Sequence, residues 1–257
     1  MTFEIKNVSF CYAEKKVIDN LSINLEAGRF YGILGPNGSG KTTLLDLLIN
    51  FRQPSSGAIF YKGKELPKFS RKELSREISL VPQNFYINFP FTAKEIVMMG
   101  RYPHIPRFSP PSLLDLRIVG EIMEKTFSLE FEDRFITELS GGERQRVVFA
   151  RSLAQDTPVL MLDEATSNLD ITHTISLLNI AARKVEDQKA TVIAILHDIN
   201  LAALFCHDLL FMKQGRIAAY GTVDNILTED NIKTVFNADA KVYYEPYSKS
   251  KQVIFKR

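Results

Sequence analysis

The feature that most limits the fold of this 257-residue chain is the eight-residue run GPNGSGKT at positions 35–42. An apolar run, Phe30–Leu34, precedes it and the leucine-rich segment Leu44–Ile49 follows, which predicts a strand, a tight loop and a helix. Glycines let the loop turn its backbone N–H groups inward, and the helix directs its positive N-terminal end at the same point. All fixed positions of a P-loop are present in this setting, which favours a phosphate-binding loop over a plain glycine-rich turn.

We therefore predict that the loop binds a nucleoside triphosphate. Lys41 is expected to place its charge on the β and γ phosphates, and Thr42 to offer its hydroxyl to Mg²⁺. The predicted nucleotide-binding residues of this segment are Gly35, Pro36, Asn37, Gly38, Ser39, Gly40, Lys41, Thr42 and Thr43.

Composition excludes several classes of protein. Apolar residues make up 45% of the chain, enough for a large core. Lys and Arg number 32 against 30 Asp and Glu, so the net charge of +2 lacks the basic excess of a dedicated nucleic-acid binder. Cys11 and Cys206 are far apart in the sequence and predict neither a disulfide framework nor a zinc site.

No signal core and no apolar run of about 18 residues is visible in the sequence. We therefore expect a cytoplasmic chain whose membrane role, if any, runs through another subunit.

Hydrophobic periodicity predicts an α/β fold. Alternating apolar positions near the N-terminus indicate antiparallel strands, and short apolar runs separated by helical stretches indicate parallel strands. The expected antiparallel strands are 3–10, 17–25 and 57–61, a short buried strand is 78–81, and the expected parallel strands are 30–34, 159–162 and 191–196.

The stretch from about 84 to 156 differs from the rest of the chain. Several prolines come first, and helical periodicity follows over 113–127 and 142–154. We predict one domain over 1–257, with a nucleotide-binding core from about 1–83 and 157–257 and an inserted helical subdomain between them.

Two adjacent carboxylates end the apolar run Val159–Leu162. Ligands of α/β sheets bind at the carboxyl ends of strands, so Asp163 is assigned to Mg²⁺ and Glu164 to polarising the attacking water. A solvated strand end is the alternative, and the upstream P-loop favours the functional interpretation.

A capping-box pattern, Ser140 with Glu143, opens the predicted helix over 142–154. Gly141 and Gly142 stand between them and leave bare N–H groups where a phosphate could approach.

The segment Leu139–Arg146 resembles the signature motif of ATP-binding cassette (ABC) ATPases. The resemblance implies that two subunits trap ATP between the P-loop of one and the signature of the other, with Ser140, Gly141, Gly142 and Glu143 contacting nucleotide. The fifth signature position is often Gln in this family, whereas this chain has Glu143.

The same resemblance extends over nearly the whole chain and assigns further roles. Tyr12 is similar to the aromatic that stacks on adenine, although a half-buried strand aromatic is the alternative. Gln83 resembles the glutamine-loop residue that touches Mg²⁺ and responds to the permease, or else merely ends a strand. Ser167-Asn168-Leu169-Asp170 resembles the D-loop, with Asp170 near nucleotide.

His197 follows a predicted parallel strand and resembles the family's switch histidine, which senses the γ phosphate. Asp198 fits the pattern without needing a catalytic role, and no chemistry is assigned to the other three histidines. The implied catalytic residues are Lys41, Gln83, Glu164 and His197, and the implied metal ligands are Thr42, Gln83 and Asp163.

Two segments resemble the ATPases of importers for iron-siderophores, haem and cobalamin: Phe89–His104 and Asn225–Phe236. In the first, Thr92 with Glu95 predicts a capped short helix that Gly100 ends. We expect the permease to contact residues 89–107, with Met98 and Tyr102 exposed.

The resemblance implies an ATP-hydrolysing subunit of P-loop fold and ABC type, with an antiparallel β subdomain and an inserted helical subdomain. It would work as a homodimer on the inner face of the membrane, with permease subunits and, indirectly, an extracytoplasmic substrate-binding protein, and without nucleic acid. The alternatives are an ATPase of another ABC transporter type, such as an exporter, or a soluble ABC ATPase acting on nucleic acid or ribosomes.

Overall fold

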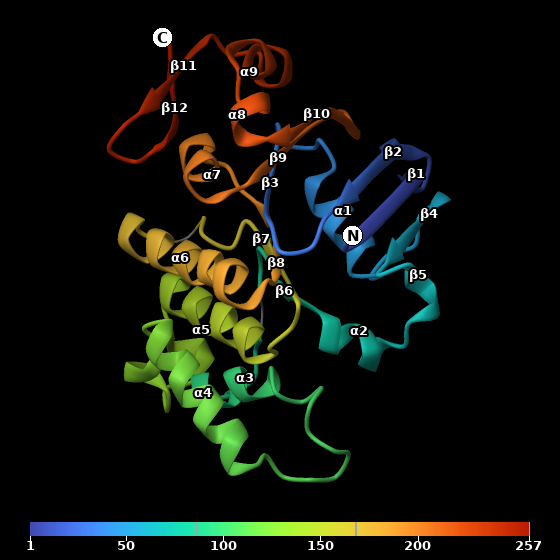
Figure 1. The fold of residues 1–257 in the computed structure, drawn as a ribbon. Helices are drawn as coiled ribbons and strands as arrows, with labels where there is room; N and C mark the ends of the chain where they lie inside the picture. Colours follow the sequence, from blue (N-terminus) through green and yellow to red (C-terminus); the bar gives the residue numbers. More distant parts are fainter. Residues whose placement is uncertain (86, 168, 257) are drawn as a thin grey trace. The chain divides into compact units, whose positions relative to one another are not determined.

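The computed structural model describes residues 1–85, 87–167 and 169–256. The chain forms two compact units, one made of 1–70 and 191–257 and the other of 71–190. Figure 1 labels the helices and strands of both.

The first unit contains an antiparallel sheet with the strand order β2 (Lys15–Leu25), β1 (Phe3–Tyr12), β4 (Ser56–Tyr61) and β5 (Lys64–Glu65). Its register pairs Phe3 with both Leu25 and Tyr61, whose apolar side chains are buried together. These pairings confirm the antiparallel strands predicted from the period-two alternation.

A second group of strands in this unit surrounds β3 (Phe30–Leu34). β3 pairs in parallel with β8 (Thr191–Ile195) on one side and with β9 (Asp208–Lys213) on the other. Every residue of β3 and β8 is buried, as expected for parallel strands covered on both faces. β10 (Arg216–Thr222) pairs antiparallel with β9.

The remaining elements of the first unit are short. They are α1 (Lys41–Leu48), η1 (Leu66–Lys68), α7 (Ile199–Phe205), α8 (Val223–Ile226), α9 (Glu229–Phe236), β11 (Ala240–Glu245) and β12 (Ser250–Phe255).

The second unit joins two parallel strands, β6 (Ile78–Val81) and β7 (Val159–Asp163), to a group of helices. Ser152 on α5 donates to the Leu80 carbonyl over 2.8 Å, which ties the helices to β6. The helices are α2 (Arg71–Glu77), α3 (Ala93–Met99), α4 (Leu113–Lys125), η2 (Leu129–Phe131), η3 (Ile136–Glu138), α5 (Gly141–Ala154) and α6 (Ile171–Gln188).

The predicted capping boxes begin α3 and α5, with both reciprocal hydrogen bonds present in each. Gly100 ends α3 as predicted, but its φ of −61° is right-handed. Glycine is needed there for another reason: a Cβ atom would lie 2.2 Å from the Arg151 carbonyl oxygen of α5. Close packing of two helices, and not a left-handed turn, therefore explains this residue.

One prediction about α3 is wrong. Met98 is only 8% exposed and packs in the core of the helical region, whereas Tyr102 is 59% exposed as predicted. Met98 belongs to the same buried hydrophobic cluster as Val119 of α4 and Val147 of α5, so it forms part of the core of the helical region.

The α/β fold class is confirmed. The two compact units divide the chain near residues 70 and 190, so β6 and β7 group with the helices. The predicted subdomain limits at 83 and 157 stay a prediction. Among the described residues, no helix combines the length and apolar character needed to cross a bilayer.

Candidate functional site

The P-loop connects β3 to α1 through a backbone conformation that favours glycine. Gly35, Gly38 and Gly40 have φ values of +156°, +77° and +99°. A Cβ atom on Gly35 would lie 2.1 Å from the Met212 carbonyl oxygen, and one on Gly40 would lie 2.7 Å from Ile18. The loop is therefore held in place by close contact with two neighbouring strands.

Polar groups inside the loop are arranged for an anion. Lys41 is buried and donates to the carbonyls of Gly35 over 2.9 Å and Pro36 over 3.2 Å. The Ser39 hydroxyl oxygen is buried without a hydrogen-bond partner among the described residues. α1 begins at Gly40 without a side-chain cap. A phosphate group would satisfy these donors and the helix N-terminus, so the loop fits the predicted ligand.

The other predicted residues of the loop differ in burial. Pro36, Asn37, Gly38 and Thr42 are exposed, whereas Thr43 is buried at the start of α1.

Tyr12 ends β1 and is partly exposed. The Arg52 guanidinium lies over its ring, 4.6 Å from the centroid, and Phe10 meets it edge-on with centroids 4.9 Å apart. Arg52 also pairs with Asp46 over 3.1 Å, which fixes the guanidinium. Sequence reasoning missed Arg52, because nothing in the spacing of a single chain links positions 12 and 52.

In the second unit, the parallel pairing of β6 and β7 brings two predicted residues together. Val81 aligns with Leu162, so the residues that follow both strands emerge at the same edge. There Gln83 donates from its amide nitrogen to the Glu164 carboxylate. Asp163 is buried at the end of β7, and Glu164 has a φ of +50°, an uncommon backbone conformation for a carboxylate residue.

The predicted signature residues form the N-terminus of α5. The Ser140 hydroxyl accepts from the Glu143 N–H over 3.3 Å, and the Glu143 carboxylate accepts from the Ser140 N–H over 2.7 Å. This backbone bond is the main cause that lowers the pKa of Glu143, with Arg134 adding to it at 3.3 Å. The carboxylate is thus held at the start of the helix.

A hollow of about 300 Å³ lies against this helix start, and we call it the signature hollow. It brings three predicted signature residues together with Asp170 of the predicted D-loop. Asn168 of that motif lies outside the described residues. The lining residues are Ser140, Gly142, Glu143, Arg146, Leu169, Asp170 and His173.

Asp170 caps α6 and accepts from both the backbone N–H and the ring Nδ1 of His173, each over 2.8 Å. These bonds lower the pKa of Asp170, the backbone bond most. No chemistry was assigned to His173 from the sequence. Its position three residues after a capping aspartate was the available signal, because i and i+3 side chains share a helix face.

His197 is exposed and follows β8, as predicted. Asp198 caps α7 and accepts from the backbone of Asn200 over 2.7 Å and Leu201 over 3.1 Å. This structural role accounts for the carboxylate beside the histidine.

Known proteins resemble this chain in sequence and in fold. Residues 18–167 match the family described as "ABC transporter". The chain belongs to the ABC transporter family. The match covers the P-loop, the signature segment and the acid pair, so the predicted resemblance is confirmed.

Two curated relatives are particularly similar. The chain is 36% identical over 96% of its length to the cobalamin import ATP-binding protein BtuD of Halobacterium salinarum, and it spans only 61% of that relative's length. It is 34% identical over 91% of its length to the iron(3+)-hydroxamate import ATP-binding protein FhuC of Bacillus subtilis, covering 87% of that relative.

A solved structure supports the fold class. The ATP-binding cassette MJ0796, determined as a dimer in a post-hydrolysis state with ADP and phosphate, superposes with a TM-score of 0.78 at 26% identity. The similarity covers 86% of this chain and 98% of the other.

Proposed function

We propose that this chain is the ATP-hydrolysing subunit of an ABC importer. The observation that carries the proposal is the P-loop. Its glycines pack closely against neighbouring strands, its lysine is buried, and its Ser39 hydroxyl has no hydrogen-bond partner among the residues that the structure describes, which suits binding of a phosphate. Family membership supports hydrolysis, and binding of the phosphates by Lys41 and the α1 N-terminus is the first step.

Mg²⁺ would be held by the Thr42 hydroxyl, the Gln83 amide oxygen and the Asp163 carboxylate. This oxygen set suits a hard cation that uses one or two carboxylates together with substrate phosphates. When bound, the ion neutralises charge on the β and γ phosphates. Among the described residues no group of three or more His, Cys, Asp or Glu side chains could hold a metal ion.

Glu164 is proposed to orient the attacking water, with Gln83 positioning its carboxylate through the hydrogen bond between them. His197 is proposed to contact the γ phosphate, and Tyr12 to stack on the adenine with Arg52 behind the ring.

Two variants test these roles. Lys41→Ala should weaken ATP binding, whereas Glu164→Gln should retain binding and lower turnover by roughly two to four orders of magnitude. Lys15→Ala, an exposed lysine of β2, is the control. Nucleotide affinity and phosphate release are the measurements, and near-normal turnover of Glu164→Gln would contradict the assignment.

We also propose that two copies share each nucleotide, with Ser140 acting on the ATP of the partner subunit. The MJ0796 cassette, to which this chain is similar, was solved as a dimer. Mixing Ser140→Arg protein with Lys41→Ala protein should restore part of the ATPase activity, since each heterodimer contains one intact composite site. Inactive mixtures in which heterodimers are shown to form would exclude the arrangement.

The proposed cargo class is a metal chelate, because the similar proteins are named for import of cobalamin and iron(3+)-hydroxamate. Transport would need permease subunits, and an extracytoplasmic binding protein would act indirectly. We place the permease contact on residues 89–107, where Phe89 is 70% exposed. Phe89→Glu should abolish co-purification with the permease, whereas Phe51→Glu, equally exposed at 70%, should not.

A further inference from the structure

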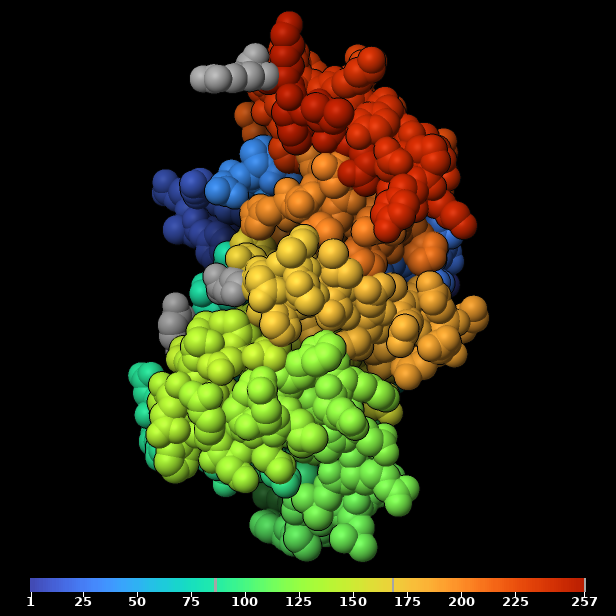
Figure 2. Space-filling model, turned by 90° about the vertical axis from the view of Figure 1, so that its left-hand side faces the viewer, coloured from blue at the N-terminus to red at the C-terminus, as the bar shows by residue number. Residues whose placement is uncertain are grey.

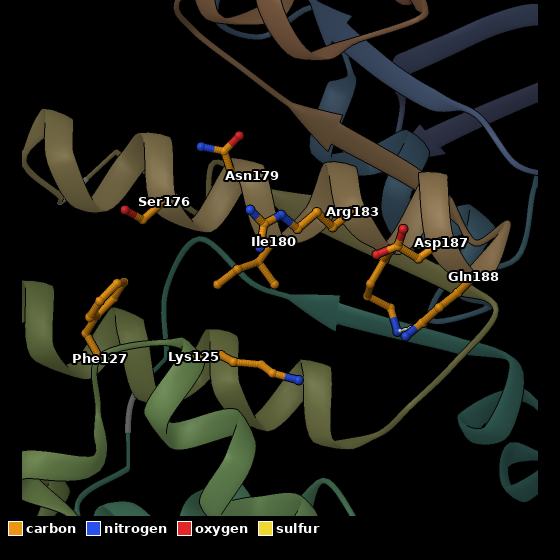
Figure 3. Close-up of a pocket in the computed structure, with 9 residues that line it drawn as sticks. Lys125, Phe127, Ser176, Asn179, Ile180, Arg183, Asp187 and Gln188 are labelled. Carbon is orange, nitrogen blue, oxygen red and sulfur yellow. Dashed lines mark hydrogen bonds between the residues drawn. The ribbon is translucent and has the colours of Figure 1, made fainter.

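A second hollow, of about 560 Å³, lies between the C-terminal end of α4 and the C-terminal half of α6 (Figure 3). We call it the α4–α6 hollow. None of the nucleotide-binding, catalytic or metal-binding residues predicted from the sequence lines it. Its volume falls within the range of about 300–1,000 Å³ that is typical of small-molecule sites. Figure 2 shows the gold residues of α6 at the surface of this part of the chain.

Positive charge gathers at this hollow. Lys125, Arg183 and Lys184 line it, against one carboxylate, Asp187. Within the described ranges, neither the Lys125 ammonium nor the Arg183 guanidinium forms a hydrogen bond or ion pair. Lys125 lies in the last turn of α4, where a cation complements the helix dipole, but Arg183 lies before the last turn of α6, beyond the reach of that effect.

Lys184 is the most buried of these cations, with its side chain only 10% exposed. Its ammonium donates to the Gln188 amide oxygen over 2.9 Å, and its distance to the Asp156 carboxylate is 3.8 Å. Burial lowers the pKa of Lys184, because a neutral amide and a distant carboxylate compensate the desolvated charge poorly. A bound anion would compensate it better.

The apolar wall is formed by Phe127 and Ile180, and Figure 3 shows Ile180 directed from α6 toward the side on which Phe127 lies. Phe127 has a φ of +53°, unusual for a bulky residue. Arg146 donates a hydrogen bond to the Phe127 carbonyl. The Phe127 ring meets the His173 ring edge-on, with the two ring centroids 6.1 Å apart. The half-exposed Phe127 ring therefore lines the same hollow as the cations.

We propose that the α4–α6 hollow binds a small amphipathic anion. An aromatic or aliphatic body would rest on Phe127 and Ile180, and a phosphate, sulfonate or carboxylate would pair with Lys125, Arg183 and Lys184. The residues that line this hollow include none of those proposed to bind nucleotide. Phe127 also connects it to the signature hollow, because its ring touches His173 and its carbonyl is held by Arg146.

The test uses phenyl phosphate as the probe, with protein labelled at the isoleucine δ1 methyl groups. The Ile180 resonance, assigned with Ile180→Val, reports this hollow alone even if the probe also enters the P-loop. A saturable shift is expected below about 10 mM probe, with inorganic phosphate and phenol each binding at least about tenfold more weakly.

Lys125→Gln combined with Arg183→Gln should weaken the binding by about tenfold or more, because two charge-assisted contacts are lost. The matched control is Arg117→Gln with Lys241→Gln, which removes the same charge from exposed positions outside the hollow. The proposal is overturned if Ile180 does not shift, if the shift survives the first pair of substitutions, or if phenol binds as tightly as phenyl phosphate.

Discussion

Two helices that begin within the nucleotide motifs, α1 and α5, start in opposite ways. α1 starts at Gly40, which has a left-handed φ of +99° and supplies no side-chain cap. α5 starts at Ser140 in extended conformation, and Ser140 and Glu143 form a complete capping box. The first helix start is shaped by backbone packing, and the second by its own side chains.

This difference determines how the N-terminus of each helix can bind a phosphate. The N-terminus of α1 has no side-chain acceptor, so an incoming phosphate gains both the helix dipole and the N–H groups. At α5 the Glu143 carboxylate already occupies the N-terminus. The signature segment therefore suits a supporting role on a nucleotide that another P-loop holds, which agrees with the proposed dimer.

Of the changes around these two helix starts, the largest expected effect comes from adding one methyl group to the loop that leads into α1. Gly35→Ala should weaken ATP binding by at least about 100-fold, because the new Cβ would lie 2.1 Å from the Met212 carbonyl oxygen and displace the loop. Gly141→Ala is the matched control: no atom lies within 4 Å of its Cβ position, so folding and ATP affinity of the single subunit should persist. Near-normal binding by Gly35→Ala would contradict the packing argument.

Removal of the Ser140 side-chain cap from α5 should have an intermediate effect, which is measured as a loss of folding stability. Ser140→Ala should lower the free energy of unfolding by about 1 kcal/mol, since the Glu143 N–H loses its acceptor. Ser140→Thr keeps the hydroxyl and should retain most of the stability. Urea denaturation followed by circular dichroism measures both. If the two variants were equally destabilised, the hydroxyl would not be the stabilising group.

A smaller effect should appear as a function of pH. The pKa of Glu143 is lowered below its ordinary value of 4.5 in the folded protein, so its contribution to stability is present above about pH 4.5. That contribution is lost as the pH falls through the lower, folded value. Glu143→Gln introduces the residue that is common at this position in the family. In this variant the free energy of unfolding should fall less steeply as the pH is lowered below about 4.5. Glu121→Gln, an exposed residue of α4, should leave that dependence on pH unchanged.

The smallest effect is expected at the other acidic residue of the signature hollow. Asp170→Asn keeps an N-cap side chain for α6, so the urea midpoint at neutral pH should move less than for Ser140→Ala. Because the pKa of Asp170 is lowered from 3.8, the variant should also lose part of the stability decrease below about pH 4. A larger shift than that of Ser140→Ala would mean that the exposed pair with His173 stabilises more than the cap.

Local sequence signals predicted most of the elements correctly. The Thr92 and Ser140 capping boxes and the β3, β6 and β8 strands lie where the patterns placed them. Each depends on hydrogen bonds within one helical turn or on burial of one short run, and such interactions are encoded by neighbouring residues.

Other features depend on residues distant in the chain. Sequence periodicity did not reveal that Met98 is buried in a cluster shared with α4 and α5. Nor did it reveal that Gly100 is needed because the Arg151 carbonyl of α5 lies beside it. The hydrogen bond from Gln83 to Glu164 spans 81 positions and exists because β6 and β7 align in parallel. The cations of the α4–α6 hollow come from helices separated by α5 and β7.

The local sequence by itself determines these motifs, because a P-loop, a capping box or a buried strand is complete within a few consecutive residues. The surroundings of each motif follow from packing, since burial and close approach depend on which distant segments meet. The Met212 carbonyl that enforces glycine at position 35 is one such case, and the Arg52 guanidinium over Tyr12 is another. Both contacts join parts of the chain that no local pattern relates.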